Sequence, residues 1–352
     1  MNVIPRLDGN RFEIRLVTAY LESEAYLPRL RELGTELTVL SNSLRGCHTR
    51  FSAFYRLLKR ERFDAVHLNL YDGLALGYAA AAKRAGVPVR IVHSHNSDLR
   101  KSLLRPAKLT VHRICRKFFR NAPTHFAACS GKAAEFMFDR SVTRAGRWTL
   151  IRNGIDAERF RCDPAGRARM RTELGADGAF VIVCVGRLCF QKNQSFLLGL
   201  LTAIMAQCPK TLLVLAGEGE DKELLRGKAE ELGVSDAVRF LGVTERIPEL
   251  LWAGDVLAMP SVFEGLGIVA IEAQAAGLPA VCSEQVPRET QITDLISYLP
   301  LDEPARWAER LLSCRDIPRR DTFEEIRAAG YTIGDTAETI RRLWSRAEQQ
   351  IR

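Results

Sequence analysis

Residues 261–283 read SVFEGLGIVAIEAQAAGLPAVCS, and this stretch predicts a helix that lies between two buried strands. The apolar run Val256–Met259 precedes it and is typical of a strand covered on both faces. The alanine-rich middle favours a helix, which Gly277 and Pro279 end because glycine caps helices and proline cannot continue them. A second strand is expected at Ala280–Cys282. The pattern indicates an α/β protein with a parallel sheet.

Two acidic side chains give this stretch a chemical character. Glu264 lies on the expected loop, followed by Gly265 and Gly267, and Glu272 lies in the first turns of the helix. The free backbone N–H groups and the macrodipole at a helix N-terminus favour an anion. Two carboxylates that accept hydrogen bonds from hydroxyl groups, on either side of a phosphate site, suit a ligand that is both sugar and phosphate. We therefore interpret the stretch as a nucleotide-sugar site.

Apolar strands alternate with amphipathic helices along the whole chain, which predicts parallel sheets with helical crossovers. In the first half we expect strands at Phe12–Thr18, Glu36–Leu40, Ala65–Leu68, Val89–His93, His125–Ala128 and Trp148–Ile151, and helices at Glu24–Leu33, Arg50–Arg60 and Gly73–Arg84. In the second half we expect strands at Val181–Val185, Thr211–Ala216, Val238–Leu241, Val256–Met259 and Ala280–Cys282. The helices between those strands are expected at Asn193–Met205, Lys222–Leu232, Ile247–Ala253 and Ile268–Ala276. A run at Ile292–Leu295, an amphipathic stretch at Pro304–Leu312 and a basic helix at Thr336–Gln350 follow.

The pattern changes near Asn153, where a turn and the polar segment Asp163–Asp177 favour a connection between two domains. We expect one domain at residues 1–160, a second at residues 161–335 and a final helix at residues 336–352 that packs back on the first. Two Rossmann-like, doubly wound halves that face each other across a cleft are the predicted architecture. Ligands of such sheets bind at the carboxyl ends of the strands.

The first loop of the second half carries two basic residues that are suited to bind an anion. Gly186 follows a strand and allows a sharp backbone turn, and Arg187 and Lys192 follow it before the next helix. An arginine can hold phosphate oxygens with two parallel N–H donors, and a lysine adds a point charge. Two such residues on a loop are often only salt-bridge partners, but the neighbouring acidic loop favours a diphosphate site.

Other strand ends carry weaker signals. The acidic, glycine-rich loop Ala216–Asp221 is expected to form a tight turn. Leu241–Val243 ends another strand, and its backbone groups, Val243 included, would meet the base of a nucleotide, although a plain turn explains the segment equally well. His95 ends a strand of the first half and would hydrogen-bond a sugar hydroxyl or a phosphate, and His67 is a weaker candidate. His93 and His95 lack a third ligand at a suitable spacing, so no metal site is expected.

Charge is unevenly distributed along the chain. Residues 1–152 contain 27 Lys and Arg against 12 Asp and Glu, whereas the rest of the chain is acidic. The segment Arg100–Arg120 alone has eight basic residues and no acidic one. Its loosely helical apolar spacing favours a basic amphipathic surface for an anionic membrane, and a solvated helix face is the open alternative. No nucleic-acid motif accompanies the charge, so nucleic acid is not an expected partner.

The apolar runs, the first ten residues and the cysteines of the sequence indicate a cytoplasmic protein. No apolar run approaches the ~18 residues that span a bilayer, and the first ten residues lack the apolar core of a signal peptide. Nine cysteines are present without a CxxC pair, and Cys129, Cys184 and Cys282 lie in apolar runs as small buried side chains. We expect a reduced cytoplasmic protein, in part peripheral at the inner face of the plasma membrane.

Taken in order, these motifs resemble those of the family 4 (group 1) glycosyltransferases, which have the GT-B fold. The matching pieces are Val185–Asn193, Phe240–Gly242, Glu264–Pro279, His93–Asn96 and Asn153–Asp156. The resemblance covers nearly the whole chain and is strongest to the exopolysaccharide and capsule branch. It implies a metal-independent hexosyltransferase that needs no cofactor and retains the anomeric configuration of the sugar.

The resemblance also implies roles for the residues. Arg187 and Lys192 would hold the donor diphosphate, with Gly186 shaping their loop. Glu272 would accept hydrogen bonds from the ribose hydroxyls. Glu264 and the Gly265–Leu266–Gly267 backbone would hold the donor sugar, and His95 would touch it from the other domain. The catalytic candidates are therefore His95, Arg187, Lys192 and Glu264.

Relatives in this family begin with a buried strand and a glycine-rich loop, and Met1 is expected to fall after both. A sheet without that central strand would expose unpaired backbone groups. Our prediction is a transferase that moves a sugar from a nucleotide sugar to a glycan or lipid-linked acceptor. The alternatives are a truncated homologue that binds without turnover and, less favoured, a nucleotide-sugar epimerase.

Overall fold

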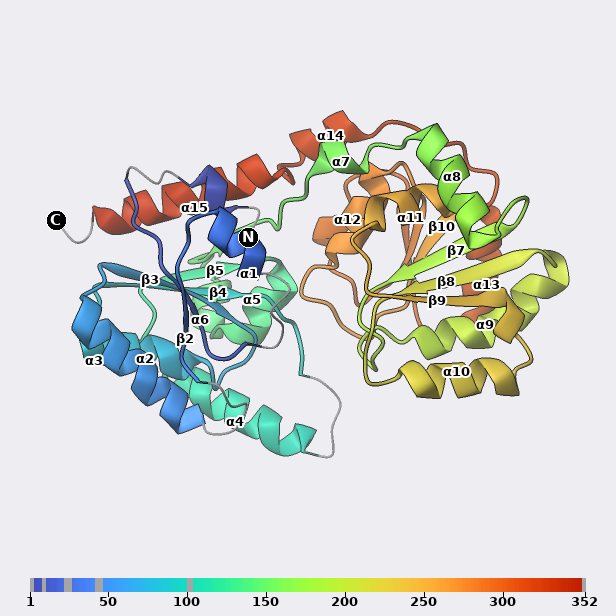
Figure 1. Cartoon of the computed structure of the whole chain (residues 1–352). Helices are drawn as coiled ribbons and strands as arrows, with labels where there is room; N and C mark the ends of the chain where they lie inside the picture. Colours follow the sequence, from blue (N-terminus) through green and yellow to red (C-terminus); the bar gives the residue numbers. More distant parts are fainter. Residues whose placement is uncertain (1–2, 8–10, 22–26, 42–46, 100–103, 350–352) are drawn as a thin grey trace. The chain divides into compact units, whose positions relative to one another are not determined.

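The computed structural model divides into two compact α/β units, each described separately below (Figure 1). The first unit contains the described residues up to Gly154 together with those from Ile333 onward, and the second contains residues 155–332. The structure describes residues 3–7, 11–21, 27–41, 47–99 and 104–349. Every ladder in both units is parallel, which confirms the predicted fold class.

The strands of the first unit form two sheets. They are β1 Leu16–Thr18, β2 Leu37–Val39, β3 Ala65–Leu70, β4 Val89–Ser94, β5 His125–Ala128 and β6 Thr149–Leu150. Among the described residues, the order β3-β4-β5-β6 makes one sheet, and β1 pairs with β2 in a separate one. The strand expected from Phe12 begins only at Leu16, and the absence of an additional central strand from this unit stays a prediction.

Helices of the first unit follow the predicted alternation. They are the 3₁₀ turn η1 Ile4–Arg6 and the helices α1 Leu27–Glu32, α2 Cys47–Glu61, α3 Leu76–Ala85, α4 Arg105–Phe118, α5 Gly131–Met137, α6 Arg140–Thr143 and α15 Ile333–Glu348. The basic segment forms α4 from Arg105 onward, and its residues 100–103 lie outside the described residues, as do residues 24–26 of the first expected helix.

The last helix of the chain belongs to the core of the first unit. On α15, Leu343 and Ala347 are buried against Ile91 of β4 and Ile151 after β6. Nearby, the ring of Trp344 meets that of Phe12 at 5.2 Å, edge to face. The last helix of the chain therefore completes the core of the first unit.

The second unit has one six-stranded sheet. Its strands are β7 Phe180–Val185, β8 Thr211–Ala216, β9 Val238–Gly242, β10 Val256–Met259, β11 Ala280–Ser283 and β12 Ile296–Leu299. Their order is β12-β11-β10-β7-β8-β9, so the chain winds one way from β7 and the other way from β10. These two neighbours mark the topological switch point, where the loops after the strands diverge and leave a crevice for a ligand.

The α-helices of the second unit include three that were not predicted, α7 Ala157–Phe160, α8 Pro164–Leu174 and α14 Phe323–Ala328. The remaining helices and 3₁₀ turns are α9 Gln194–Gln207, α10 Lys222–Glu231, η2 Ser235–Ala237, α11 Ile247–Ala253, α12 Ile268–Ala275, η3 Arg288–Thr290 and α13 Pro304–Ser313. The interpretation of Asp163–Asp177 as a polar connection was wrong, since α8 fills most of it. The Asp163 side chain caps this helix, and Gly175 ends it in the left-handed conformation.

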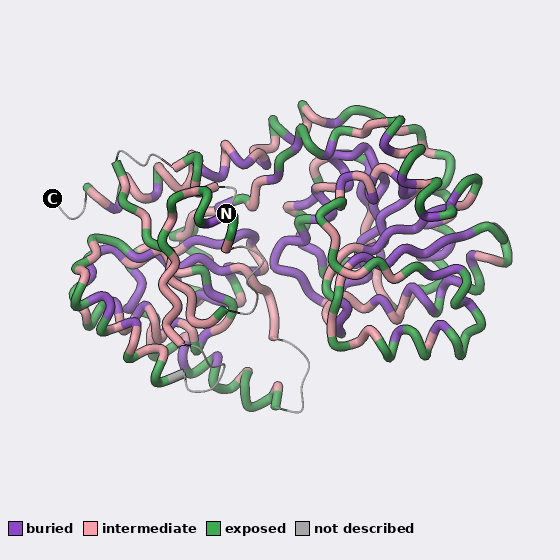
Figure 2. The backbone as a smooth tube through the Cα atoms, in the orientation of Figure 1, coloured by how far each residue is buried: buried purple, intermediate pink, exposed green. Residues whose placement is uncertain are grey.

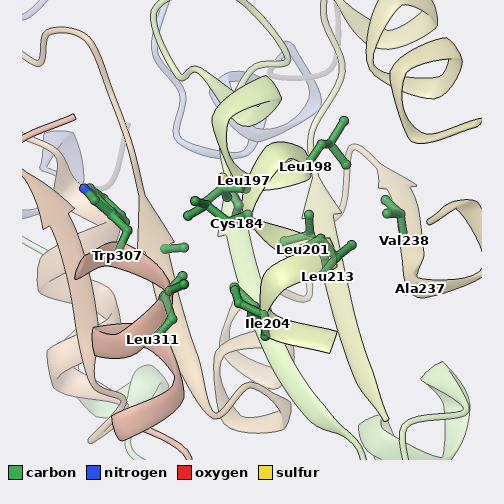
Figure 3. Close-up of a cluster of buried hydrophobic side chains, with 14 of the residues drawn as sticks. Cys184, Leu197, Leu198, Leu201, Ile204, Leu213, Ala237, Val238, Trp307 and Leu311 are labelled. Atoms are coloured by element: carbon green, nitrogen blue, oxygen red, sulfur yellow. The ribbon is translucent and has the colours of Figure 1, made fainter. Parts of the chain in front are cut away.

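Burial explains why the strands of the second unit are almost continuously apolar. Helices cover the sheet, so its inner strands β11, β10, β7 and β8 are buried in Figure 2 and do not alternate polar with apolar side chains. In Figure 3, Leu201 and Ile204 of α9 lie beside Leu213 of β8, and Trp307 and Leu311 of α13 lie on the other side of the same apolar cluster. Each such side chain contributes roughly 1.5–3 kcal/mol by leaving water. Among the described residues, no helix has both the length and the apolar character needed to cross a bilayer.

Candidate active site

The β7–α9 loop begins at a glycine for a steric reason. Gly186 has a φ of +145°, a conformation that side chains disfavour. A Cβ there would lie 3.0 Å from the Cε atom of Lys192, so the lysine chain crosses directly over the glycine backbone. The turn thus brings the ammonium group back over the end of β7.

The β8–α10 loop stacks on this turn, backbone against backbone. The N–H of Gly186 donates to Ala216 O at 2.9 Å, and the N–H of Leu188 donates to Glu218 O at 3.0 Å. A Cβ on Gly217 would lie 2.2 Å from Gly186 O, a distance that no side chain tolerates. The predicted tight turn is therefore a close contact between two loops at the end of the sheet.

The β10–α12 loop is fastened to the β7–α9 loop from the other side. Val262 N donates to Gln191 O at 2.8 Å, and Gln191 Nε2 donates to Phe263 O at 3.1 Å. Asn193 Nδ2 donates to Pro260 O at 3.2 Å. Three hydrogen bonds therefore hold the two loops of the switch point as one structure.

A buried ion pair joins the same loops. Lys192 Nζ lies 2.6 Å from Glu264 Oε1, and Ser261 Oγ donates to that oxygen at 2.7 Å. Glu264 is only 6% exposed. Below the pair, burial raises the pKa of the Cys184 thiol to about 12, with smaller and opposing influences of Lys192 and Glu264. A buried charge needs such a partner, because desolvation of an isolated carboxylate is costly.

The loop then turns into α12 through a left-handed glycine. Gly267 has a φ of +90°, and a Cβ there would lie 2.9 Å from Met259 Cε. The Leu266 side chain is buried, so this residue offers only its backbone to a ligand. The helix N-terminus therefore carries N–H groups at the switch point, beside the ion pair, where an anion is favoured.

Glu272 lies further along α12 in a different environment. Burial raises its pKa to about 7, and the charge of Arg159 opposes that rise. Arg159 belongs to α7, and its Nη2 donates to Glu245 O at 2.9 Å in the loop after β9. This carboxyl group is therefore more readily protonated near neutral pH than the usual glutamate.

Arg187 and Val243 lie on the exposed side of these loops. Arg187 Nε is 3.0 Å from Glu220 Oε2, and both side chains are about half exposed. A bound diphosphate would displace Glu220 from the Arg187 guanidinium at little cost in free energy, because exposed ion pairs are weak. Val243 is 81% exposed, after Gly242, whose carbonyl accepts from Gly217 N at 2.8 Å. Its apolar surface is open to a base.

Histidines gather on β3 and β4 of the first unit, where His67 lies inside β3 and not at its end as expected, and His93 and His95 lie at the end of β4. His67 Nε2 lies 3.3 Å from His93 Nδ1, Trp344 Nε1 donates to His67 Nδ1 at 3.1 Å, and His95 Nε2 bonds Asn69 Oδ1 at 2.8 Å. Burial lowers the pKa of His67 and of His95 to about 4. These rings are therefore neutral at pH 7. In the parts of the chain that the structure describes, no cluster suited to a metal ion is found.

The structure brings some of the predicted residues together and leaves others apart. Gly186, Lys192 and Glu264 form one contiguous group, whereas Arg187 contacts Glu220 and Glu272 interacts with Arg159. The sequence interpretation missed Ser261 and Arg159. Ser261 lies three residues before Glu264 in the quoted stretch and could have been found there. Arg159 carries no local signal, because only packing places α7 near Glu272.

This fold and this loop arrangement define a class of protein. Residues 167–308 match the model of glycosyl transferases group 1, and residues 1–159 match that of glycosyltransferase family 4. The chain belongs to this family of GT-B glycosyltransferases.

Individual relatives agree with the family. The chain is 32% identical over 339 residues to a putative glycosyltransferase, EpsF, of Bacillus subtilis, which covers 93% of this chain and 87% of that protein. It is 29% identical to an Escherichia coli UDP-Gal:alpha-D-GlcNAc-diphosphoundecaprenol alpha-1,3-galactosyltransferase, over 66% of this chain and 60% of the relative. The crystal structure of HepE from Anabaena in complex with UDP-glucose has a TM-score of 0.68 at 22% identity, over 93% of this chain and 87% of that one, a likeness of fold.

Proposed function

We propose that this glycosyltransferase moves a hexose from a nucleotide sugar to a glycan or lipid-linked acceptor in cell-surface polysaccharide synthesis, with retention of anomeric configuration. The observation that carries the proposal is the Lys192–Glu264 pair at the switch point, joined to the loop that presents Arg187. A cationic group beside a helix N-terminus suits a diphosphate leaving group, on which negative charge grows as the glycosidic bond breaks.

The proposed donor site uses the three loops at the switch point. Arg187 and Lys192 hold the diphosphate, and Glu272 accepts hydrogen bonds from the ribose hydroxyls. Glu264 and the backbone of Gly265–Gly267 hold the sugar, and the exposed face of Val243 packs against the base. Support comes from HepE, a protein of the same fold that was crystallised with UDP-glucose.

His95 of the first unit is proposed to touch the donor sugar. Its ring is neutral, so it acts as a hydrogen-bond partner and not as a charge. No metal ion or other cofactor is part of this proposal, since the protein's own cations offset the diphosphate charge.

The proposed acceptor is a sugar linked to a lipid through diphosphate. The Escherichia coli relative is named for such an acceptor, and EpsF is named as a glycosyltransferase. A lipid-linked acceptor stays in the membrane, so the enzyme is proposed to be cytoplasmic and to bind the inner face of the plasma membrane. The basic helix α4 supports this location, because it carries no acidic residue.

A turnover assay tests the proposal against a protein that binds without reacting. The full chain is incubated with UDP-glucose or UDP-galactose, with and without GlcNAc-diphosphoundecaprenol, and released UDP and extended lipid are measured. The proposal predicts UDP release that requires the acceptor, and an α linkage in the product by NMR. Donor binding without acceptor-dependent release would favour the non-catalytic alternative, and an inverted linkage would contradict retention.

A further inference from the structure

A cavity of about 380 Å³ lies in the first unit, away from the histidines. It is formed by the end of α4, the start of β5 and the short helix α6, with Arg116, Phe126 and Ser141 among its lining residues. Because β5 runs parallel to β4, the cavity is at the amino ends of the strands, whereas His93 and His95 are at the carboxyl ends. The proposed donor chemistry does not use it.

Three arginines line this cavity, namely Arg116, Arg120 and Arg147. Backbone carbonyls orient two of them, since Arg116 Nη2 donates to Phe138 O and Arg147 Nη2 donates to Ser141 O at 2.9 Å. Each guanidinium has five N–H donors, so both retain donors for a ligand. Within the described chain, no hydrogen bond or ion pair is found for Arg120.

One acidic group in the cavity offsets part of this charge. Asp139 Oδ1 accepts from Ser141 N at 2.9 Å and so caps α6. That backbone N–H lowers the pKa of Asp139, and the charges of Arg116 and Arg120 lower it further. Its carboxylate is therefore ionised at pH 7, and three guanidinium groups against one carboxylate leave two positive charges. A phosphate monoester carries about 1.5–2 negative charges at this pH and matches them.

Apolar surface adjoins the charged cavity. Phe119 and Met137 are among the lining residues, and the Phe119 ring meets that of Phe118 at 5.0 Å, edge to face. Phe118 is 79% exposed and Ile114 is 61% exposed on α4, which appears mostly exposed in Figure 2. Exposed aromatic and aliphatic side chains beside arginines are typical of surfaces that enter the interfacial layer of a membrane.

We propose that this cavity binds the phosphate of a lipid headgroup, of the phosphatidic acid type, while Phe118 and Ile114 enter the apolar layer. This inference deepens the proposed membrane location and rests on it. It adds a defined binding site and a preferred lipid headgroup to a surface that would otherwise be attracted to anionic membranes by charge alone. The proposed transfer reaction is not required for it.

The test uses the full chain and dihexanoyl phosphatidic acid below its micelle concentration, so that no membrane surface is present. Isothermal titration of the Arg120→Gln and Arg147→Gln variants is expected to show affinity about tenfold weaker or more, because each loses a charge-assisted phosphate contact. Arg113→Gln is the matched control. It removes the same charge from the exposed face of α4 outside the cavity, and it is expected to bind within about twofold of the unmodified protein.

Equal losses of affinity for the soluble lipid in Arg113→Gln and Arg120→Gln would overturn the proposal, because they would indicate that the overall positive charge, and not the cavity, attracts the lipid. Inorganic phosphate is titrated in parallel, and binding as tight as that of the short lipid would also overturn it. Vesicles of phosphatidylcholine with phosphatidic acid form the second arm, in which Phe118→Ser is expected to lose most binding while retaining affinity for the soluble lipid. If the soluble lipid binds and vesicles do not, the membrane location fails and the headgroup site stands.

Discussion

At the scale of single residues, two glutamates in one stretch have different chemistry. Glu264 Oε1 lies 2.6 Å from Lys192 Nζ in a buried ion pair, whereas burial raises the pKa of Glu272 to about 7. The difference follows from position. Glu264 lies on a loop within reach of the ammonium group of a neighbouring loop, and Glu272 lies on α12, where burial outweighs the opposing charge of Arg159. Because the pKa of Glu272 is near 7, the charge of its carboxyl group changes with pH in the neutral range.

Donor affinity is predicted to depend on pH through Glu272. An ionised carboxylate accepts hydrogen bonds from two ribose hydroxyls, so binding favours the deprotonated form, which falls as pH drops below 7. Between about pH 8 and about pH 6, the affinity for UDP-glucose is expected to weaken about tenfold. The Glu272→Gln variant should bind more weakly and independently of pH. Calorimetry at several pH values measures both, and an equal pH dependence in the variant would contradict the ribose role.

The residues that could be predicted from the sequence share one property. Gly186, Lys192 and Glu264 follow apolar strands directly, and parallel sheets gather such loops at one edge. Arg159 could not be predicted in this way. Its place depends on how the short helix α7 packs against α12, which no local pattern records.

At the scale of elements, the site depends on stacked loops. The loops after β7 and β8 touch through backbone atoms, and Gly217 permits the contact. Long apolar strands and their helices were predicted closely, because their cores dictate the pattern. The helix α8 was missed because only a few of its residues, such as Met170 and Leu174, face the core.

Replacing Gly217 by alanine is predicted to unfold the loop stack. The new Cβ would lie 2.2 Å from Gly186 O, in a backbone conformation that alanine disfavours. We expect a loss of at least about 2 kcal/mol in the free energy of unfolding, together with weaker donor binding. Denaturant titration measures the first quantity.

Gly227→Ala is the control for this prediction. Gly227 lies in α10 with open space around its Cα, so alanine should stabilise the protein by about 0.5–1 kcal/mol. Similar stability of the Gly217→Ala variant and the unmodified protein would show that the loops do not need this contact.

At the scale of the whole molecule, the chain leaves its first unit near Gly154 and returns at Ile333. The second unit is therefore an insertion between the early strands and α15, which completes the first core. Parallel sheets were predicted in both halves. The division of the first half into a sheet of four strands and a pair was not, because strand pairing depends on contacts distant in sequence.

The Leu343→Ala substitution in α15 is predicted to destabilise only the first unit. Leu343 is buried with Ile91 and Ile151, so the cavity left behind should cost about 3 kcal/mol. Arg342→Ala on the exposed side of the same helix should change stability by less than about 0.5 kcal/mol. Hydrogen exchange measured by mass spectrometry reports the stability of each unit separately. Faster exchange of β7–β10 than of β4 and β5 would refute the assignment of α15.

The central claim is that the loops at the switch point of the second unit grip a donor diphosphate. Calorimetric titration of UDP-glucose into the unmodified chain, Arg187→Gln and Arg169→Gln tests it directly. Both arginines are exposed in the second unit, but Arg169 lies on α8 beside Asp163. The account predicts about tenfold or weaker binding for Arg187→Gln and unchanged binding for Arg169→Gln. Equal affinity of all three proteins would contradict it.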